Sequence, residues 1–491
     1  MESTILSNDL EKNITLISSN APANFNFKTR ELILKDNIKC IIIYIEGLSK
    51  KEDIESCIIS PLLSKIDCDI NALLSPASYI GKRYITINDI ELSSDVNVIS
   101  KNLKKGKSII LIEHDNTAII CNTSQSNFKK FAESKIEENI RGEKSAFVNN
   151  LHINVSLIQE KLKNNNLKIE LYTFGEENNC EASLIYLENT IDPDVLNKIK
   201  SKLQTVKTSY VPDTGYLMQF IEKRPLSIFP QSKLTEKPDK VVSDIIQGKA
   251  AIFVNGCAYA IVLPVVFVEF FQAFEDYSNR LILANFDRFI RFLALLIILT
   301  ASPIYLVLIK YYASLIPLNL IKIIIISRKN IPLPPFLEIL SMELLIEFLR
   351  EGGLRLPSTI GQTLSIIGGI IIGDAAIKSG IVSPTTLVVT ALTVISTFLI
   401  PNYEMSLSIR LLRFYILILA QFFGFFGIFI GLFSIFAHLI NLDSFGIPYF
   451  SPFAPMRFKD LKDSTVRYSL KDTNRIPISF IRRKIKNKKN E

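Results

Sequence analysis

The chain has 491 residues, of which 48% are hydrophobic and 21% charged, and its formal net charge is +8. A mean hydropathy of +0.27 is high for a soluble protein, although the charged fraction is ordinary. This combination indicates two unlike halves averaged together and argues against a uniformly soluble chain.

Polarity separates these two halves of the sequence. Residues 1–245 are rich in Asn, Lys, Ser and Glu, whereas residues 289–440 hold long runs of Ile, Leu and Phe. Residues 1–39 are polar and contain no apolar core of the length that a secretory signal needs. We therefore expect the first half to lie on the cytoplasmic side of a membrane.

The end of the sequence carries the positive charge. Between Arg457 and Glu491 there are twelve Lys and Arg residues against four Asp and Glu residues, so the rest of the chain is neutral. Such a tail can bind nucleic acid, but directly after an apolar region it is more often a cytoplasmic retention signal attracted by anionic lipid. We expect membrane lipid, and no nucleic acid, as its partner.

Cysteine and histidine give no sign of a metal site. The six cysteines all lie in the first half or just after it, none in CxxC spacing, and there are three histidines. The sequence has no nucleophile elbow, Walker loop or dinucleotide fingerprint. We therefore expect no catalytic residue, no metal and no cofactor, and an enzyme is the least favoured class.

The first half alternates strand-like and helix-like stretches. Residues 40–47 predict a buried strand, residues 51–65 a helix, and residues 108–113 with 117–122 a hairpin. Further along we expect a helix at 145–164, strands at 167–175 and 182–188, and a helix at 193–203. These elements indicate two α/β subdomains that meet near residues 140–150.

Residues 250–268 could pass for a membrane span on hydropathy alone. However, Asn255-Gly256 separates two β-rich arms, and this dipeptide is the strongest short-range signal of a hairpin. We predict a hairpin here, followed by an amphipathic connector over residues 271–280.

The second half contains apolar stretches long enough to cross roughly 30 Å of hydrocarbon. We expect four firm spans, at 289–309, 361–380, 381–401 and 411–440. Re-entrant or interfacial segments would bring the number of helices to as many as six. A first half and a tail that both lie on the cytoplasmic side require an even number of crossings.

The predicted fold class is therefore α+β and multidomain, with a cytoplasmic α/β region followed by a polytopic α-helical membrane domain. Its expected parts are a first α/β subdomain (1–145), a second α/β subdomain with hairpin and connector (146–280), a helical transmembrane domain (281–450) and a basic cytoplasmic tail (451–491).

A helix that starts near Pro335 carries charges within the apolar half. At about 100° per residue, Glu343, Glu347 and Arg350 fall on one narrow stripe. A charge at the bilayer centre costs about 2.5–3.5 kcal/mol even on the insertion scale, so this stripe should not face lipid. It is expected to be ion-paired or interfacial, which is favoured over the alternative that it lines a pore.

Small residues line two of the expected spans. Gly369 and Gly373 have the small-xxx-small spacing that lets helix backbones approach closely, and Asp374 adjoins that face. A similar stripe in the last span contains Gly424, Gly427 and Gly431. These glycines are expected to pack helices, within the chain or between subunits, and Asp374 either pairs with a neighbour or contributes to an ion path.

Seven segments identify a family resemblance, because they occur together and in one order. They are PDTGYLMQFIEKRPLSIFPQ (212–231), EKPDKVVSDIIQGKAAIFVNG (236–256), FQAFEDY (271–277), REGGLRLP (350–357), GQTLSIIGGIIIGDAAIKSGIVSP (361–384), FLIPNYEMSLSIRLLRF (398–414) and FGIPYFSPFAP (445–455). From about residue 131 to 455 the chain resembles the A subunits of bacterial spore germinant receptors, the GerA family. It departs from the family's R-G-P-R-E pattern, since residues 141–145 read RGEKS.

The resemblance implies a multi-pass protein of the endospore inner membrane, with the N-terminal region and the tail on the side of the spore core. It implies two partners, a transporter-like B subunit that binds the germinant and a C-subunit lipoprotein. It also implies a homo-oligomeric, nutrient-gated ion channel whose opening releases cations and triggers germination.

Two other classes fit parts of the sequence. A SpoVA-associated accessory paralogue has a similar layout and would act without a pore of its own. A secondary transporter would show inverted repeats and broken helices at the membrane midplane, and the glycine-rich 361–380 segment offers a little of this without a repeat elsewhere.

Overall fold

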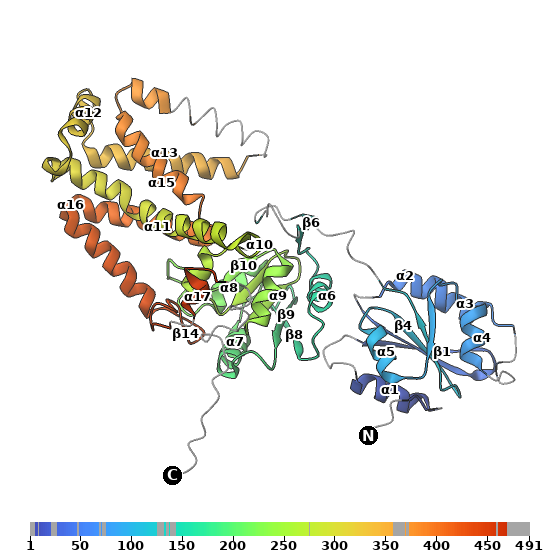
Figure 1. The fold of residues 1–491 in the computed structure, drawn as a ribbon. Coiled ribbons are helices and arrows are strands. Elements are labelled where there is room, and N and C mark those ends of the chain that lie inside the picture. Colours follow the sequence, from blue (N-terminus) through green and yellow to red (C-terminus); the bar gives the residue numbers. More distant parts are fainter. Residues whose placement is uncertain are drawn as a thin grey trace, which may run out of the picture.

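A computed structural model gives the architecture as two α/β parts followed by a helical part (Figure 1). It describes residues 5–7, 9–20, 27–46, 49–67, 70, 75–124, 132–133, 137, 144–273, 275–356, 369, 373–457 and 460–468.

The first part is an antiparallel five-stranded sheet with helices on both faces. Its strands, in spatial order, are β1 (Phe27–Ile33), β2 (Lys39–Ile45), β4 (Ser108–Ile112), β5 (Ala118–Cys121) and β3 (Ile90–Ser93). One face packs on α1 (Leu10–Asn20) and α5 (Val96–Leu103), the other on α2 (Lys51–Ile54), α3 (Ser60–Ser64) and α4 (Pro76–Arg83). The central strands are apolar throughout because both of their faces are covered. The predicted strand, helix and hairpin of this part are confirmed.

The second part repeats this plan with another five-stranded antiparallel sheet. Its spatial order is β10 (Lys233–Thr235), β12 (Ala260–Leu263), β11 (Ala250–Val254), β9 (Cys180–Leu187) and β8 (Leu167–Phe174). Helices α7 (Pro193–Thr205) and α8 (Thr214–Ile221) cover one face, and α6 (Leu151–Lys161) and α9 (Pro238–Ile246) cover the other.

The predicted hairpin at 250–268 is confirmed, since β11 and β12 pair antiparallel with Ala250 opposite Leu263 and Ile252 opposite Ile261. Every residue of both strands is buried, which explains why their sequence is as apolar as a membrane span.

The helix predicted at 145–164 is too long at its N-terminal end. Helix α6 begins only at Leu151, because the Asn150 side chain accepts a hydrogen bond from the backbone N–H of Ile153 and caps the helix there. The preceding Ser145–Ala146 forms a short strand, β7, that pairs with β6 (Ala132–Glu133).

A short connector joins the second sheet to the helical part. It consists of a 3-10 helix, η5 (Phe267–Phe271), and helix α10 (Glu275–Ser278). Phe267, Phe270 and Phe271 are buried in the same apolar core as side chains of the helical part. The connector is therefore packed against the helices that it precedes.

The helical part contains α11 (Leu281–Lys310), α12 (Leu318–Arg328), α13 (Pro335–Leu354), α15 (Pro384–Thr397) and α16 (Tyr403–Asn441). Within the described residues, α11 and α16 are long and apolar enough to cross a membrane, and α15 is a shorter apolar helix. The span predicted at 361–380 lies mostly outside the described residues. The predicted number of four spans is therefore not confirmed.

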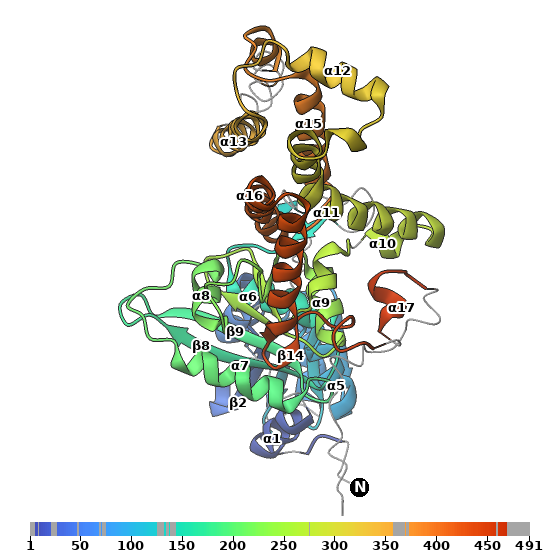
Figure 2. The same cartoon turned by 90° about the vertical axis from the view of Figure 1, so that its left-hand side faces the viewer.

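The segment predicted as a long span at 411–440 is not one straight helix, because α16 bends sharply at Gly424, whose φ of 61° and ψ of −139° are not helical. We call residues 403–423 the first arm and residues 425–441 the second arm. The arms fold back on each other: the hydroxyl groups of Tyr415 and Ser434 are 3.0 Å apart. Figure 1 shows them as a V, and Figure 2 shows the second arm descending to the second sheet.

The bend frees backbone carbonyl groups that a straight helix would satisfy. The carbonyl oxygen of Gln421 instead accepts hydrogen bonds from Tyr311 Oη at 2.6 Å and Lys310 Nζ at 3.1 Å. Periodicity could not reveal the bend, since apolar and small residues continue through it on both arms.

After α16 the chain returns to the second part of the protein. A small hairpin of β13 (Asp443–Ser444) and β14 (Ile447–Pro448) is followed by a short helix, α17 (Leu461–Ser464). The Ser444 hydroxyl donates to the carbonyl oxygen of Gln231, and the backbone N–H of Phe267 donates to the carbonyl oxygen of Tyr449. The basic residues 469–491 lie outside the described part.

Candidate functional site: the charged helix crossing and the connector

Two helices bring opposite charges together where α13 crosses the first arm of α16. Glu347 accepts hydrogen bonds from Arg410 Nη1 and Arg413 Nη2, each at 2.9 Å. The Nε atom of Arg413 lies 3.5 Å from Glu343 Oε2, and Arg350 Nη1 lies 3.8 Å from Glu347 Oε1. We call these five residues the charged helix crossing.

Burial makes this crossing a strong constraint on the packing of α13 against α16. Glu343 is 0% exposed and Arg413 is 1% exposed. Removing one member of a buried ion pair typically costs about 3–5 kcal/mol, because it leaves the other charge uncompensated. The two helices are therefore held at this position by charges that require each other.

A second buried carboxylate, that of Glu338 in α13, contacts residues of α12 and of the start of α15. Glu338, which is 0% exposed, accepts hydrogen bonds from the backbone N–H of Ser383 at 2.8 Å and from its hydroxyl group at 2.6 Å. The same carboxylate pairs with Arg328 at 3.2 Å. Ser383 also caps α15, since its hydroxyl accepts from the backbone N–H of Thr386.

The structure places the polar residues predicted from the sequence in two locations. Glu343, Glu347 and Arg350 come together in the charged helix crossing. Asp374 is not part of it, because it pairs with Lys378 one helical turn away, at 2.7 Å, and its side chain is 58% exposed.

Sequence reasoning missed the cationic partners of these carboxylates. Arg410 and Arg413 lie three residues apart, and the carboxylates that they meet lie four residues apart, so each pair shares one face of an otherwise apolar helix. These two spacings were the available signal, but nothing in the sequence indicates that the two helices cross there.

The glycines that were predicted to pack helices differ in how closely other atoms approach them. An added Cβ atom on Gly431 would lie 3.1 Å from Ile416 Cγ1, so this glycine lets the two arms of α16 approach. A Cβ atom on Gly373 would meet Leu387 at 4.0 Å, and one on Gly369 would meet nothing within 4 Å. The close contacts of Gly431 lie within the chain.

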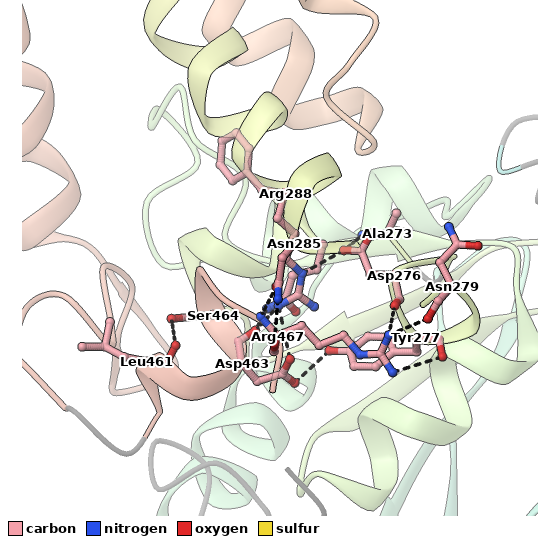
Figure 3. Close-up of polar contacts among 12 residues, drawn as sticks. Ala273, Asp276, Tyr277, Asn279, Asn285, Arg288, Leu461, Asp463, Ser464 and Arg467 are labelled. Atoms are coloured by element: carbon pink, nitrogen blue, oxygen red, sulfur yellow. Dashed lines mark hydrogen bonds and ion pairs between the residues drawn. The ribbon is translucent and has the colours of Figure 1, made fainter. Parts of the chain in front are cut away.

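Another buried charge, the carboxylate of Asp276, holds the connector (Figure 3). This residue is 0% exposed and accepts hydrogen bonds from Arg291 Nη1 at 2.8 Å and from Arg288 Nε at 3.0 Å. Since both arginines lie near the start of α11, Asp276 fixes the entry of the connector into that helix.

The segment around α17 completes this network (Figure 3). Arg288 Nη1 donates to the carbonyl oxygen of Asp463 at 2.6 Å, and Tyr277 Oη donates to its carboxylate at 2.9 Å. Arg467 donates to the backbone carbonyl oxygens of Asp276 and Asn279. Burial raises the pKa of Asp463 above its ordinary value, although Arg288 opposes that effect.

A chain of buried ions connects the second sheet to the same connector. Lys233 and Lys249 each lie 2.7 Å from Asp244, and Lys249 also lies 2.7 Å from Glu269 in η5. Burial disfavours the ionised form of Asp244, but the two ammonium groups outweigh that effect and lower its pKa to about 2. A cavity of about 520 Å³ lies beside these ions, between α9, the connector and the loop before α16.

The connector is held by ionic contacts at both of its ends. Lys249 pairs with Glu269 at one end, and Asp276 pairs with Arg288 near the start of α11 at the other. Helix α11 in turn packs along α16, which carries part of the charged helix crossing. Among the residues that the structure describes, no cluster of His, Cys, Asp and Glu could hold a metal ion.

Comparison with known proteins finds a family match over most of the chain. Residues 15–479 match the family model described as the Bacillus/Clostridium GerA spore germination protein. The chain is 32% identical to spore germination protein KA of Bacillus subtilis (strain 168), over 94% of this chain and 85% of that one. It is 33% identical to spore germination protein GerLA of Bacillus cereus, over 89% of each chain.

A solved structure also matches part of the chain. It is the N-terminal domain of the A subunit of the Bacillus megaterium spore germinant receptor GerK3, with 22% identity and a TM-score of 0.41, over 54% of this chain and 99% of that one. The family match spans most of the sequence, as the seven ordered segments predict. The chain therefore belongs to the GerA family of spore germination proteins.

Proposed function

We propose that this chain is the A subunit of a nutrient germinant receptor in the endospore inner membrane. In this proposal it acts as an oligomeric, signal-transducing component of an ion-conducting channel. Its partners are a transporter-like B subunit that binds the germinant and a C-subunit lipoprotein. Family membership supports the role in germination, and the two long apolar helices support a place in a membrane.

The observation that carries the transducing role is that buried ionic contacts hold both ends of the connector, one end to the second sheet and the other to α11. Lys249 contacts Glu269, and Asp276 contacts Arg288 and Arg291, at distances of 2.7 to 3.0 Å. Because these groups are buried and paired, a displacement of the second sheet is transmitted to the start of α11 rather than absorbed by a loose linker.

In the proposed mechanism, germinant bound by the partner subunit shifts the soluble half of this chain. The connector then moves α11, and α11 moves against α16 and the charged helix crossing. Several copies of the chain surround the conducting path, with the N-terminal region and the tail on the side of the spore core.

The experiment is cation release from spores that carry Asp276→Asn or Glu347→Gln in place of the wild-type chain. We expect nutrient-triggered release to become slower or to be lost in both variants, with the protein still present in the spore membrane. Arg355→Gln is the control, since Arg355 forms an exposed pair with Glu351 on the same helix as Glu347.

Normal release from both variants at normal protein levels would contradict the transducing role. Purified chain in a planar bilayer separates the proposed channel from a transporter. Ohmic current supports a channel, whereas saturable uptake without unitary current steps contradicts it.

A further inference from the structure

A cavity of about 640 Å³ lies where the helical part meets the second sheet. Its walls come from the end of α13, the loop between α15 and α16, the first turns of α16, Leu234 in β10, and Tyr259 directly before β12. We call it the junction cavity. If α15 and α16 enter a bilayer, as the proposed function requires, their connecting loop lies near the level of the lipid headgroups.

Two guanidinium groups give this cavity a site for an anion. Arg350 and Arg410 both line it, and Arg410 is only 7% exposed. The Nε atom of Arg410 is buried and has no hydrogen-bond partner in the protein. A buried donor without a partner is costly, so a ligand oxygen at this position would be stabilising.

The charges around the cavity disfavour a group with more than one negative charge. The charged helix crossing has three arginines for two carboxylates. Glu137 lines the cavity but is already paired with Lys240 at 3.1 Å. Glu404 adds one further carboxylate to the wall, which offsets the third arginine and disfavours a doubly charged phosphate.

The remaining wall of the cavity is apolar. Phe398, Ile400 and Leu407 line it, and the Arg350 guanidinium carbon lies 5.1 Å from the centre of the Phe398 ring. Cationic and apolar walls in one cavity match a molecule that has an anionic head and a hydrocarbon chain.

We propose that the junction cavity binds the phosphodiester headgroup of a membrane phospholipid. The phosphate lies beside Arg350 and Arg410, and the first part of an acyl chain lies against Phe398 and Leu407. This inference rests on the membrane location in the proposed function. Because the cavity joins α13, α16 and the second sheet, a bound lipid contacts both of the parts that the connector couples.

The test is thermal unfolding of the purified full chain in detergent, with dihexanoyl phosphatidylglycerol added below its micellar concentration. We expect the lipid to raise the unfolding temperature of the wild type at saturable concentrations. Arg350→Gln and Arg410→Gln should each raise the half-saturating concentration about tenfold, as expected when one charge-assisted contact is lost.

Two further variants separate ligand binding from damage to the fold. Leu407→Trp fills the apolar wall without changing a charge, and it should also abolish the lipid effect. Arg355→Gln removes an exposed arginine directly after the helix that contains Arg350 and should bind lipid as the wild type does.

Several outcomes would overturn the proposal. They are no saturable effect of the lipid, an equal effect of inorganic phosphate, an equal loss of binding in Arg355→Gln, or unchanged binding in Leu407→Trp. The assay reads neither conductance nor germination, so a chain that conducts but binds no lipid would refute this site and leave the proposed function standing.

Discussion

A Cβ atom on Gly427 would lie 2.1 Å from the carbonyl oxygen of Leu419, although the two residues are eight positions apart in α16. Eight residues of straight helix would separate them by about 12 Å along the axis. The contact exists because the chain reverses at Gly424, where φ is 61°. Close approach of the two arms of α16 thus depends on glycine at both positions.

The first prediction is that Gly427→Ala destabilises the full chain by roughly 3 kcal/mol, since its Cβ atom would meet backbone rather than a movable side chain. Thermal unfolding in detergent measures the loss. Gly352→Ala in α13 is the matched control: its Cβ atom would meet nothing within 4 Å, so the change should stabilise by about 0.5–1 kcal/mol.

A wild-type unfolding temperature for Gly427→Ala would mean that the arms do not touch at this glycine. Loss of oligomer size with an unchanged unfolding temperature would instead assign the glycine to a contact between subunits, the alternative that the sequence leaves open.

The second prediction concerns the pair Glu343 and Arg413, which are both buried. Arg413→Gln should cost about 3–5 kcal/mol, because it leaves the Glu343 carboxylate uncompensated in an apolar surrounding. The double variant Glu343→Gln/Arg413→Gln should cost less than the sum of the two single changes. Strict additivity of the three unfolding free energies would show that the two side chains do not interact.

The sequence was informative wherever a local rule decided the structure. Asn255-Gly256 between β-rich arms predicted the hairpin of β11 and β12 correctly, although hydropathy alone favours a span there. Continuous apolar runs likewise predicted β2, β4 and β5. The two predicted hairpins, β11 with β12 and β4 with β5, join strands that are neighbours in the sequence.

Contacts between distant residues could not be predicted in this way. Glu347 and Arg413 are 66 positions apart, and periodicity places each on a helix face without indicating what that face meets. The bend of α16 was missed for a related reason, because a glycine with a positive φ looks the same in the sequence as a glycine that packs helices. These residues are also the ones on which the proposed coupling depends.

The third prediction concerns thiol reactivity in the first sheet. Cys40 and Cys121 are 0% exposed, and burial raises the pKa of each thiol to about 12. Both should therefore resist alkylation by iodoacetamide at pH 8 in the folded chain, while the half-buried Cys57 reacts. Mass spectrometry of peptides, with a denatured sample as the control, measures the three rates. Equal rates at Cys40 and Cys57 would contradict the placement of Cys40 inside the sheet.

The last prediction is a pH dependence that originates at Asp244. Its pKa is lowered from 3.8 to about 2 in the folded chain, so its stabilising contribution is fully present above pH 4 and is lost as pH falls towards 2. That shift corresponds to roughly 2 kcal/mol. The unfolding free energies of wild type and Asp244→Asn should therefore converge as pH falls through this range.

Asp53→Asn serves as the control, since Asp53 forms an exposed pair with Lys50 and should differ little from wild type at any pH. A gap between wild type and Asp244→Asn that stays constant from pH 6 to pH 2 would contradict the assignment. It would mean that Lys233 and Lys249 do not hold this carboxylate in its ionised form, and that the ionic path to Glu269 begins elsewhere.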